Sequence, residues 1–136
     1  MTAQRTDTII INKKEYTLYS LPLDQYWNDF GHRVSLLGGS TALWRGYHAT
    51  WMLEANQLFL TDFWGENFLM KKEYCLEDVF PNQQKVFADW YTGDLSIPFG
   101  KQINYFHGGL GGWTHEYNAT IKIDNGVVIA TDFKDS

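Results

Sequence analysis

The sequence predicts a single all-β or β-rich α+β domain, an antiparallel barrel or sandwich of about eight short strands with one or two short helices. Turn signals recur at short intervals, no long helical period interrupts them, and aromatic residues make up 17% of the chain. Aromatic side chains are favoured on pleated sheets, so this content agrees with a β-sheet core. A chain of 136 residues suits one domain, and we expect residues 1–136 to form it.

The N-terminal part of the chain predicts a hairpin followed by a short helix. Residues 8–20 form two β-type segments on either side of a polar turn at residues 12–14. Asp24 is a suitable N-cap for the helix, and Gly31 is placed to end it. The apolar side of this helix would carry Tyr26, Trp27 and Phe30.

Residues 42–53 alternate as a β-strand does, and residues 54–56 turn the chain into a second strand at residues 58–61. One face of the first strand would carry Leu43, Tyr47, Ala49, Trp51 and Leu53. The other face would carry Trp44, His48 and Met52. Because both faces have large rings, we expect a central strand that is covered on both sides. Arg45 falls on the first face, where it needs either a position at the rim or a buried acidic partner.

The middle of the chain predicts a short helix and a meander. One or two helical turns at residues 76–80 would end at Pro81. Three short strands separated by turns would follow, at residues 86–91, 95–97 and 102–106.

The C-terminal hairpin is indicated by its turn. Asn125-Gly126 favours the positive φ angles of a type I′ turn and separates the strands at residues 114–123 and 127–133. The glycine-rich residues 107–113 precede this hairpin, and we expect a mobile loop there. The loop either connects two strands or adapts to a ligand or a partner.

The chain resembles itself at an offset of 70 residues. Residues 45–63 align with residues 115–133, so that Tyr47-His48-Ala49-Thr50 meets Tyr117-Asn118-Ala119-Thr120. Either an old duplication has produced two related hairpins in a pseudo-twofold arrangement, or similar hairpins have selected similar residues.

Charge and cysteine usage exclude several classes of protein. The formal net charge of −5 disfavours nucleic acid as a partner and favours a basic protein. The single Cys75 cannot form an internal disulfide, which indicates a reducing compartment. No apolar run is long enough to span a bilayer, so we expect a cytoplasmic protein that does not bind membranes. Nothing in the residue pattern predicts an oligomeric state.

No catalytic or cofactor motif is present in the sequence. The glycine-rich segment lacks the lysine of a phosphate-binding loop, and no nucleophile elbow occurs. His107, His115 and Glu116 do not have a known metal-ligand spacing, and the last two would point to opposite faces of a strand. We expect no catalytic residues, no metal and no cofactor, and keep an enzyme of unknown class as an alternative.

Two short segments, residues 40–47 and 93–101, resemble segments of small bacterial proteins that have no assigned activity. This resemblance implies a bacterial source and adds no function.

The leading hypothesis is a non-catalytic binding protein that presents an acidic, aromatic surface to a basic protein, as an immunity or antitoxin protein does. Acidic side chains would steer the partner, and aromatic rings would anchor it. The partner-binding residues would be Asp62, Trp64, Glu66, Asp89, Trp90 and Asp94.

The alternative hypothesis is a β-barrel that holds a small molecule in an aromatic cavity. Tyr47, Trp51, Trp113 and Tyr117 would line this cavity. Arg45 or His115 would bind a polar or anionic group of the ligand.

Overall fold

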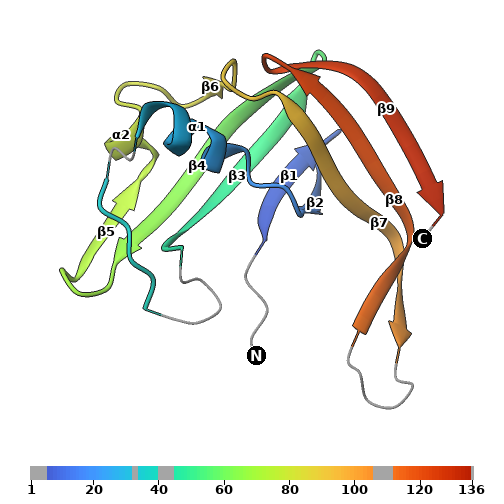
Figure 1. The fold of residues 1–136 in the computed structure, drawn as a ribbon, viewed down its shortest axis with the longest axis horizontal. Helices are drawn as coiled ribbons and strands as arrows, with labels where there is room; N and C mark the ends of the chain where they lie inside the picture. Colours follow the sequence, from blue (N-terminus) through green and yellow to red (C-terminus); the bar gives the residue numbers. More distant parts are fainter. Residues whose placement is uncertain (1–5, 32–33, 40–44, 106–111, 136) are drawn as a thin grey trace.

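The computed structural model describes residues 6–31, 34–39, 45–105 and 112–135, without the side chains of residues 99–105, 112–118 and 133–135. Nine strands in these ranges form one strongly curved mixed sheet that nearly closes into a barrel, with two short helices (Figure 1). The prediction of a β-rich barrel with short helices is therefore confirmed.

The first half of the sheet has the order β2-β1-β3-β4. Its strands are β1 (Asp7–Ile11), β2 (Lys14–Leu18), β3 (Tyr47–Glu54) and β4 (Gln57–Asn67). β1 and β3 pair in parallel, whereas β1–β2 and β3–β4 are antiparallel hairpins. We call this unit the first half-sheet.

The second half of the sheet continues from β4 in the order β9-β8-β7. Its strands are β7 (Gly93–Tyr105), β8 (Gly112–Asp124) and β9 (Val127–Asp135), all antiparallel to their neighbours. We call this unit the second half-sheet. Two further short strands, β5 (Lys72–Cys75) and β6 (Val86–Phe87), pair with the outer edge of β4.

The two half-sheets meet at a second place, between the end of β2 and the start of β7. The backbone N–H of Tyr19 donates to the Ser96 carbonyl at 2.9 Å, and the Ser20 hydroxyl donates to the Asp94 carbonyl at 2.9 Å. These bonds bring the first and last strands of the sheet together, which is why the sheet is nearly closed.

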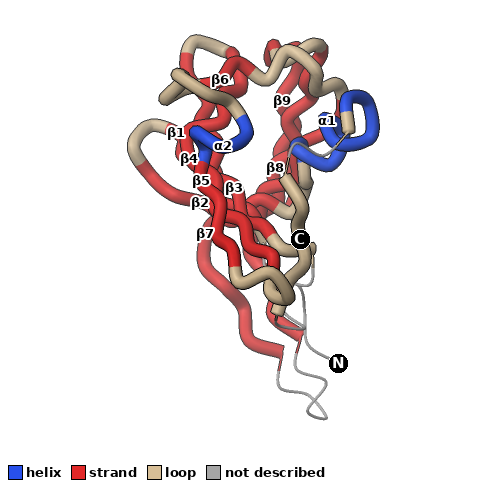
Figure 2. The backbone as a smooth tube through the Cα atoms, turned by 90° about the vertical axis from the view of Figure 1, so that its left-hand side faces the viewer, coloured by secondary structure: helices blue, strands red, loops and turns tan. Residues whose placement is uncertain are grey.

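Helices α1 (Pro22–Phe30) and α2 (Leu76–Val79) lie toward the end of the molecule that carries β6 (Figure 2). Gly31 is the C-cap of α1, as predicted, but Leu21 occupies the N-cap position, and Asp24 lies in the first turn. The prediction of Asp24 as N-cap was wrong because Pro22, whose ring fixes φ, supplies the first helical position. Phe30 is also not on the buried side, since 65% of its surface is exposed.

The C-terminal β-strands are longer and fewer than the predicted meander. β7 runs without a turn from Gly93 to Tyr105, with one irregularity between Phe99 and Gln102. The Pro98-Phe99-Gly100 turn signal therefore marks a bulge inside a strand, where proline and glycine are also found. β6 contains two residues of the predicted strand 86–91, and β5 was not predicted at all.

The β3–β4 and β8–β9 hairpins share most of their register at the offset of 70 residues. Thr50 pairs with Asp62, and Thr120 pairs with Asp132; the pairs nearest the two turns also correspond. Asn125 and Gly126 have positive φ values, as the predicted type I′ turn requires, and Ala55 and Asn56 have positive φ values as well. The hairpins differ in the position of one bulged residue, which is Thr61 in β4 and Ile129 in β9.

The two turns pack against each other about a local twofold axis. Leu58 N–H donates to the Gly126 carbonyl at 2.8 Å, and Val128 N–H donates to the Asn56 carbonyl at 2.8 Å. Gln57 pairs with Val127 between these bonds. The offset of 70 residues converts the first of these two hydrogen bonds into the second, and it relates the two members of the Gln57–Val127 pair to each other. The repeat is therefore present in the structure as well as in the sequence.

Aromatic residues fill the interior between α1 and the sheet. Trp51, Tyr47 and Phe63 are at most 2% exposed. The rings of Tyr47 and Phe63 stack at 5.8 Å, and Trp27 of α1 makes an edge contact with each of them. This face of β3 is the core face, as the alternation predicted.

The opposite face of β3 is not covered as expected. His48 and Met52 on this face are only half-buried, because it is the outer surface of the curved sheet. Trp44, which was assigned to the same face, lies outside the described residues.

A buried carboxylate joins β1 to β3. Asp7 is fully buried and accepts hydrogen bonds from Arg45 Nη2 at 2.7 Å, from Ala49 N–H at 3.1 Å and from Trp51 Nε1 at 3.0 Å. Burial raises the pKa of the Asp7 carboxyl, against the lowering effects of Trp51, Arg45 and Ala49. Of the two alternatives predicted for Arg45, a position at the rim or a buried acidic partner, the structure shows the buried partner, Asp7.

Replacing Asp7 should destabilise the protein strongly. Asp7→Leu removes the acceptor of three donors, two of them buried, and we expect the free energy of unfolding to fall by about 3 kcal/mol or more. The matched control is Asp29→Leu on the exposed side of α1, which should change it by less than about 0.5 kcal/mol. Denaturant unfolding measures both, and equal losses would contradict the role of Asp7.

The packing of the Asn125-Gly126 turn against Ala88 should tolerate no side chain at Gly126. Gly126 has φ +84°, and an added Cβ would lie 2.7 Å from the Ala88 carbonyl oxygen. We expect Gly126→Ala to lower the free energy of unfolding by about 2–3 kcal/mol, from left-handed strain plus this collision. The control is Asn125→Ala, at the neighbouring exposed turn position with φ 50°, which should cost about 1 kcal/mol or less. Similar losses in thermal unfolding would show that the contact with Ala88 is unimportant.

Candidate functional site

Three of the predicted partner-binding residues share the outer face of β4. Asp62, Trp64 and Glu66 alternate with the buried residues of this strand. Trp64 is 36% exposed, and its Nε1 donates to Glu73 Oε1 of β5 at 3.0 Å, which fixes the orientation of the indole. The face therefore carries three carboxylates around one exposed tryptophan.

Two of these carboxylates oppose each other directly. Glu66 pairs with Glu73 in the antiparallel β4–β5 ladder, so their side chains leave the sheet on the same side. Lys72 is the cross-strand partner of Asn67 and lies on the opposite side. Like charges in this position destabilise an isolated sheet, and a cationic partner would relieve the repulsion.

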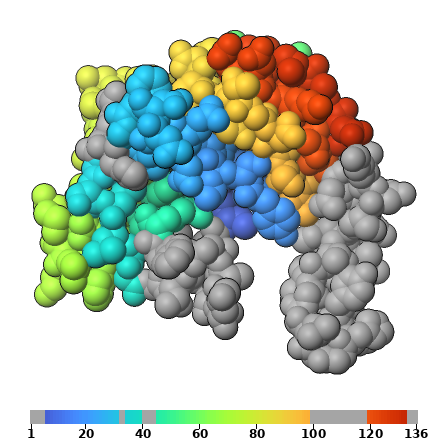
Figure 3. Space-filling view, viewed as in Figure 1, coloured from blue at the N-terminus to red at the C-terminus, as the bar shows by residue number. Residues whose placement is uncertain are grey.

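The turn between β4 and β5 presents three consecutive apolar side chains. Phe68, Leu69 and Met70 are 57%, 74% and 54% exposed. Figure 3 shows this β4–β5 hairpin projecting from the molecule beside the segment that contains Leu37, which is itself 39% exposed. Sequence reasoning missed this group, although the run Phe68-Leu69-Met70 followed by two lysines was a visible signal.

Hydrogen bonds hold this apolar turn in one conformation. The side chain of Asn67 is buried, donates to the Ser35 carbonyl at 3.1 Å and accepts from Met70 N–H at 3.0 Å. Phe68 N–H donates to the Leu37 carbonyl at 2.8 Å. We call Leu37, Phe68, Leu69 and Met70 together the apolar tip.

The remaining predicted partner-binding residues lie elsewhere. Trp90 is half-buried, its Nε1 donates to the Pro22 carbonyl at 3.1 Å, and its ring stacks on Phe80 at 5.8 Å. Asp89 is exposed next to it, and Asp94 is exposed at the start of β7. The structure thus places one set of three residues on β4 and the other set of three near α1 and β7.

The predicted ligand-binding residues that the structure describes belong to the core. Tyr47 and Trp51 are buried, and the Arg45 guanidinium, bound to Asp7, lies 4.6 Å above the Tyr47 ring. The Tyr47 hydroxyl donates to Asp24, and burial followed by this carboxylate raises its pKa. The side chains of Trp113, His115 and Tyr117 lie outside the described part of the chain, as does the loop at residues 107–111.

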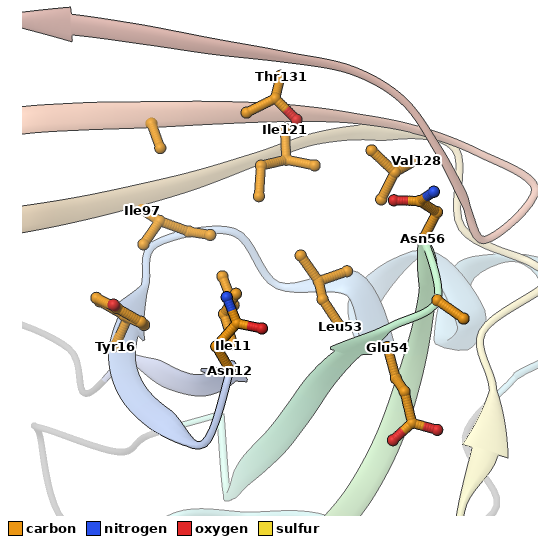
Figure 4. Close-up of a pocket in the computed structure, with 12 residues that line it drawn as sticks. Ile11, Asn12, Tyr16, Leu53, Glu54, Asn56, Ile97, Ile121, Val128 and Thr131 are labelled. Atoms are coloured by element: carbon orange, nitrogen blue, oxygen red, sulfur yellow. The ribbon is translucent and has the colours of Figure 1, made fainter.

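A cleft of about 400 Å³ opens between the two half-sheets, where they diverge from the contact of their turns (Figure 4). We call it the half-sheet cleft. The first half-sheet and its turns contribute Ile11, Asn12, Tyr16, Leu53, Glu54, Ala55 and Asn56. The second half-sheet contributes Ile97, Ala119, Ile121, Val128 and Thr131. None of the described ligand-site candidates, Arg45, Tyr47 and Trp51, is in this lining.

Titratable groups meet in pairs at several places. Beside Asp7–Arg45 and Tyr47–Asp24, Lys85 Nζ binds Glu54 Oε1 at 2.6 Å at the edge of the cleft. Burial also raises the pKa of Tyr91, whose hydroxyl donates to the Asp94 carbonyl at 2.7 Å. An enzyme of unknown class stays an untested prediction.

The described side chains include no group of three or more His, Cys, Asp or Glu residues close enough to hold a metal ion. His107, His115 and Glu116, weighed above as ligands, are outside that set. As far as the described residues go, no helix is both long and apolar enough to cross a bilayer.

Comparisons of the chain with protein-family models, with curated proteins and with solved structures found no match.

Proposed function

We propose that the protein is a non-catalytic binding protein that engages a basic protein partner through its β4–β5 hairpin. The observation that carries this proposal is the apolar tip, which adjoins the acidic outer face of β4 and β5. Large exposed apolar side chains at the end of a hairpin are unfavourable in water unless a partner covers them.

The chemistry of the hairpin matches the general anatomy of protein interfaces. Binding energy concentrates in a few aromatic and large apolar residues, and charged residues at the rim steer the partner. Phe68, Leu69 and Trp64 would be the anchors, and Asp62, Glu66 and Glu73 would face the positive charges of the partner. Because Asn67 already fixes the turn, little conformational entropy is lost when the tip is covered.

The apolar tip should be needed for binding but not for folding. In affinity capture from lysate of the source cells, we expect Leu69→Ser to reduce retention of a basic protein by at least tenfold, because it removes a central apolar contact. Phe30→Ser is the matched control, since Phe30 is 65% exposed on α1, away from the hairpin. Both variants should unfold at the wild-type temperature within about 2 °C. A partner that binds both variants equally, or that is itself acidic, would refute the proposal.

Removing the charge of Glu73, which lies opposite Glu66, should raise the stability of the protein and lower its affinity for the partner. Glu73→Gln keeps an acceptor for Trp64 Nε1 and removes the repulsion with Glu66, so the free energy of unfolding should rise by about 0.5 kcal/mol. Affinity for the captured partner should fall, with less dependence on salt, because one attractive charge is lost. Glu15→Gln, on the distant and exposed part of β2, should change neither quantity. Loss of stability together with unchanged affinity would contradict the role given to Glu73.

A further inference from the structure

The half-sheet cleft is lined by two opposed aliphatic walls. Ile11 and Leu53 of the first half-sheet face Ile97, Ile121 and Val128 of the second (Figure 4). Ile97 and Ile121 are at most 6% exposed, whereas the other three are half-buried and pack on the core with part of their surface. The walls therefore offer apolar surface from both sides to anything that enters the cleft.

The size of the cleft sets the size of its ligand. A volume of about 400 Å³ lies at the small end of the range typical of small-molecule sites. It has room for roughly a dozen groups the size of a water molecule, so a chain of about eight to ten carbons with a small head would fill it.

Uncharged polar groups lie around the aliphatic walls. The amides of Asn12 and Asn56 and the hydroxyls of Tyr16 and Thr131 belong to the lining, and both asparagines are exposed. These groups can donate and accept hydrogen bonds to an alcohol or an amide.

Charges in the lining argue against an ionised head group. Among the described residues that line the cleft, none is Lys, Arg or His, so an anion would find no counter-charge there. Glu54 is bound to Lys85 at 2.6 Å, and its side chain points away from the second half-sheet (Figure 4). A cation would therefore gain little from Glu54, and the net charge of −5 further disfavours anions.

From these four observations we infer that the half-sheet cleft binds a small neutral amphiphile, a single unbranched apolar chain with an uncharged hydrogen-bonding head. The chain lies between Leu53 and Ile121, and the head meets the asparagine amides. This site shares no residue with the β4–β5 hairpin, so it stands independently of the proposed protein partner.

A series of 1-alkanols from hexanol to dodecanol tests the size of the site by calorimetry on the full chain. Affinity should rise about fourfold for each added methylene, which corresponds to about 0.8 kcal/mol, and should level off near ten carbons. The absence of saturable binding would overturn the inference. A continued rise through dodecanol would also overturn it, because nonspecific apolar adsorption has no such limit.

Head groups of equal chain length test the charge argument. We expect 1-octanol to bind at least tenfold more tightly than octanoate and more tightly than octylammonium, each measured as monomer. Octanoate binding as tightly as 1-octanol would overturn the assignment of a neutral ligand.

Two tryptophan substitutions on the same strand test the location. Thr131 is exposed and lines the cleft, so Thr131→Trp should fill it and weaken 1-octanol binding at least tenfold. Ile129→Trp is the matched control, because Ile129 is the bulged residue, is 63% exposed and is not in the lining. Thr131→Leu adds less volume and should weaken 1-decanol more than 1-hexanol. Equal affinities for the wild type and Thr131→Trp, with both folded, would overturn the site.

Discussion

The architecture depends on the backbone contact between two hairpin turns. Leu58 and Val128 exchange hydrogen bonds with the turn residues of the opposite hairpin, and this joins two half-sheets that otherwise pair with their own strands. From this point the half-sheets diverge, and their backbones meet again where β2 reaches β7. The aromatic core and the cleft both occupy the space that this geometry encloses. The turn of the second hairpin also packs closely on the segment after β6, because Gly126 has no side chain to collide with the Ala88 carbonyl oxygen.

The interior is specified by one buried ion pair within a large apolar cluster. Burying Asp7 is costly, and its three hydrogen bonds and the Arg45 charge offset that cost only in one arrangement of β1 and β3. The parallel pairing of β1 with β3 therefore has a defined register. The stack of Tyr47 on Phe63 then supports α1, whose Trp27 makes an edge contact with both rings.

Patterns of neighbouring residues predicted the elements that depend on few residues, such as single strands and tight turns. Alternation identified the core face of β3, and Asn125-Gly126 identified the last hairpin, because a side chain or a dihedral angle decides each of them. The continuous β7 was not predictable, since Pro98 and Gly100 mark a turn and a bulge equally well. The cleft could not be predicted from the sequence either. Leu53 and Ile121 are separated by 68 positions, and they face each other only because the two half-sheets pack together. Trp90 was assigned to a partner-binding surface because it lies near the end of a predicted strand, whereas its contacts with Phe80 and Pro22 come from other segments of the chain.

The two hairpins of the internal repeat differ in the structures that surround them. Two hairpins with matching registers support the same framework, yet β4 carries two additional strands and the projecting tip, whereas β9 lends Val128 and Thr131 to the wall of the cleft. The two hairpins thus differ in what they carry, although both contribute residues to the lining of the cleft, Leu53 and Asn56 from the first and Val128 and Thr131 from the second. A substitution of Thr131 can therefore alter the cleft while the distant apolar tip keeps its structure, as long as the backbone contact between the two turns is kept.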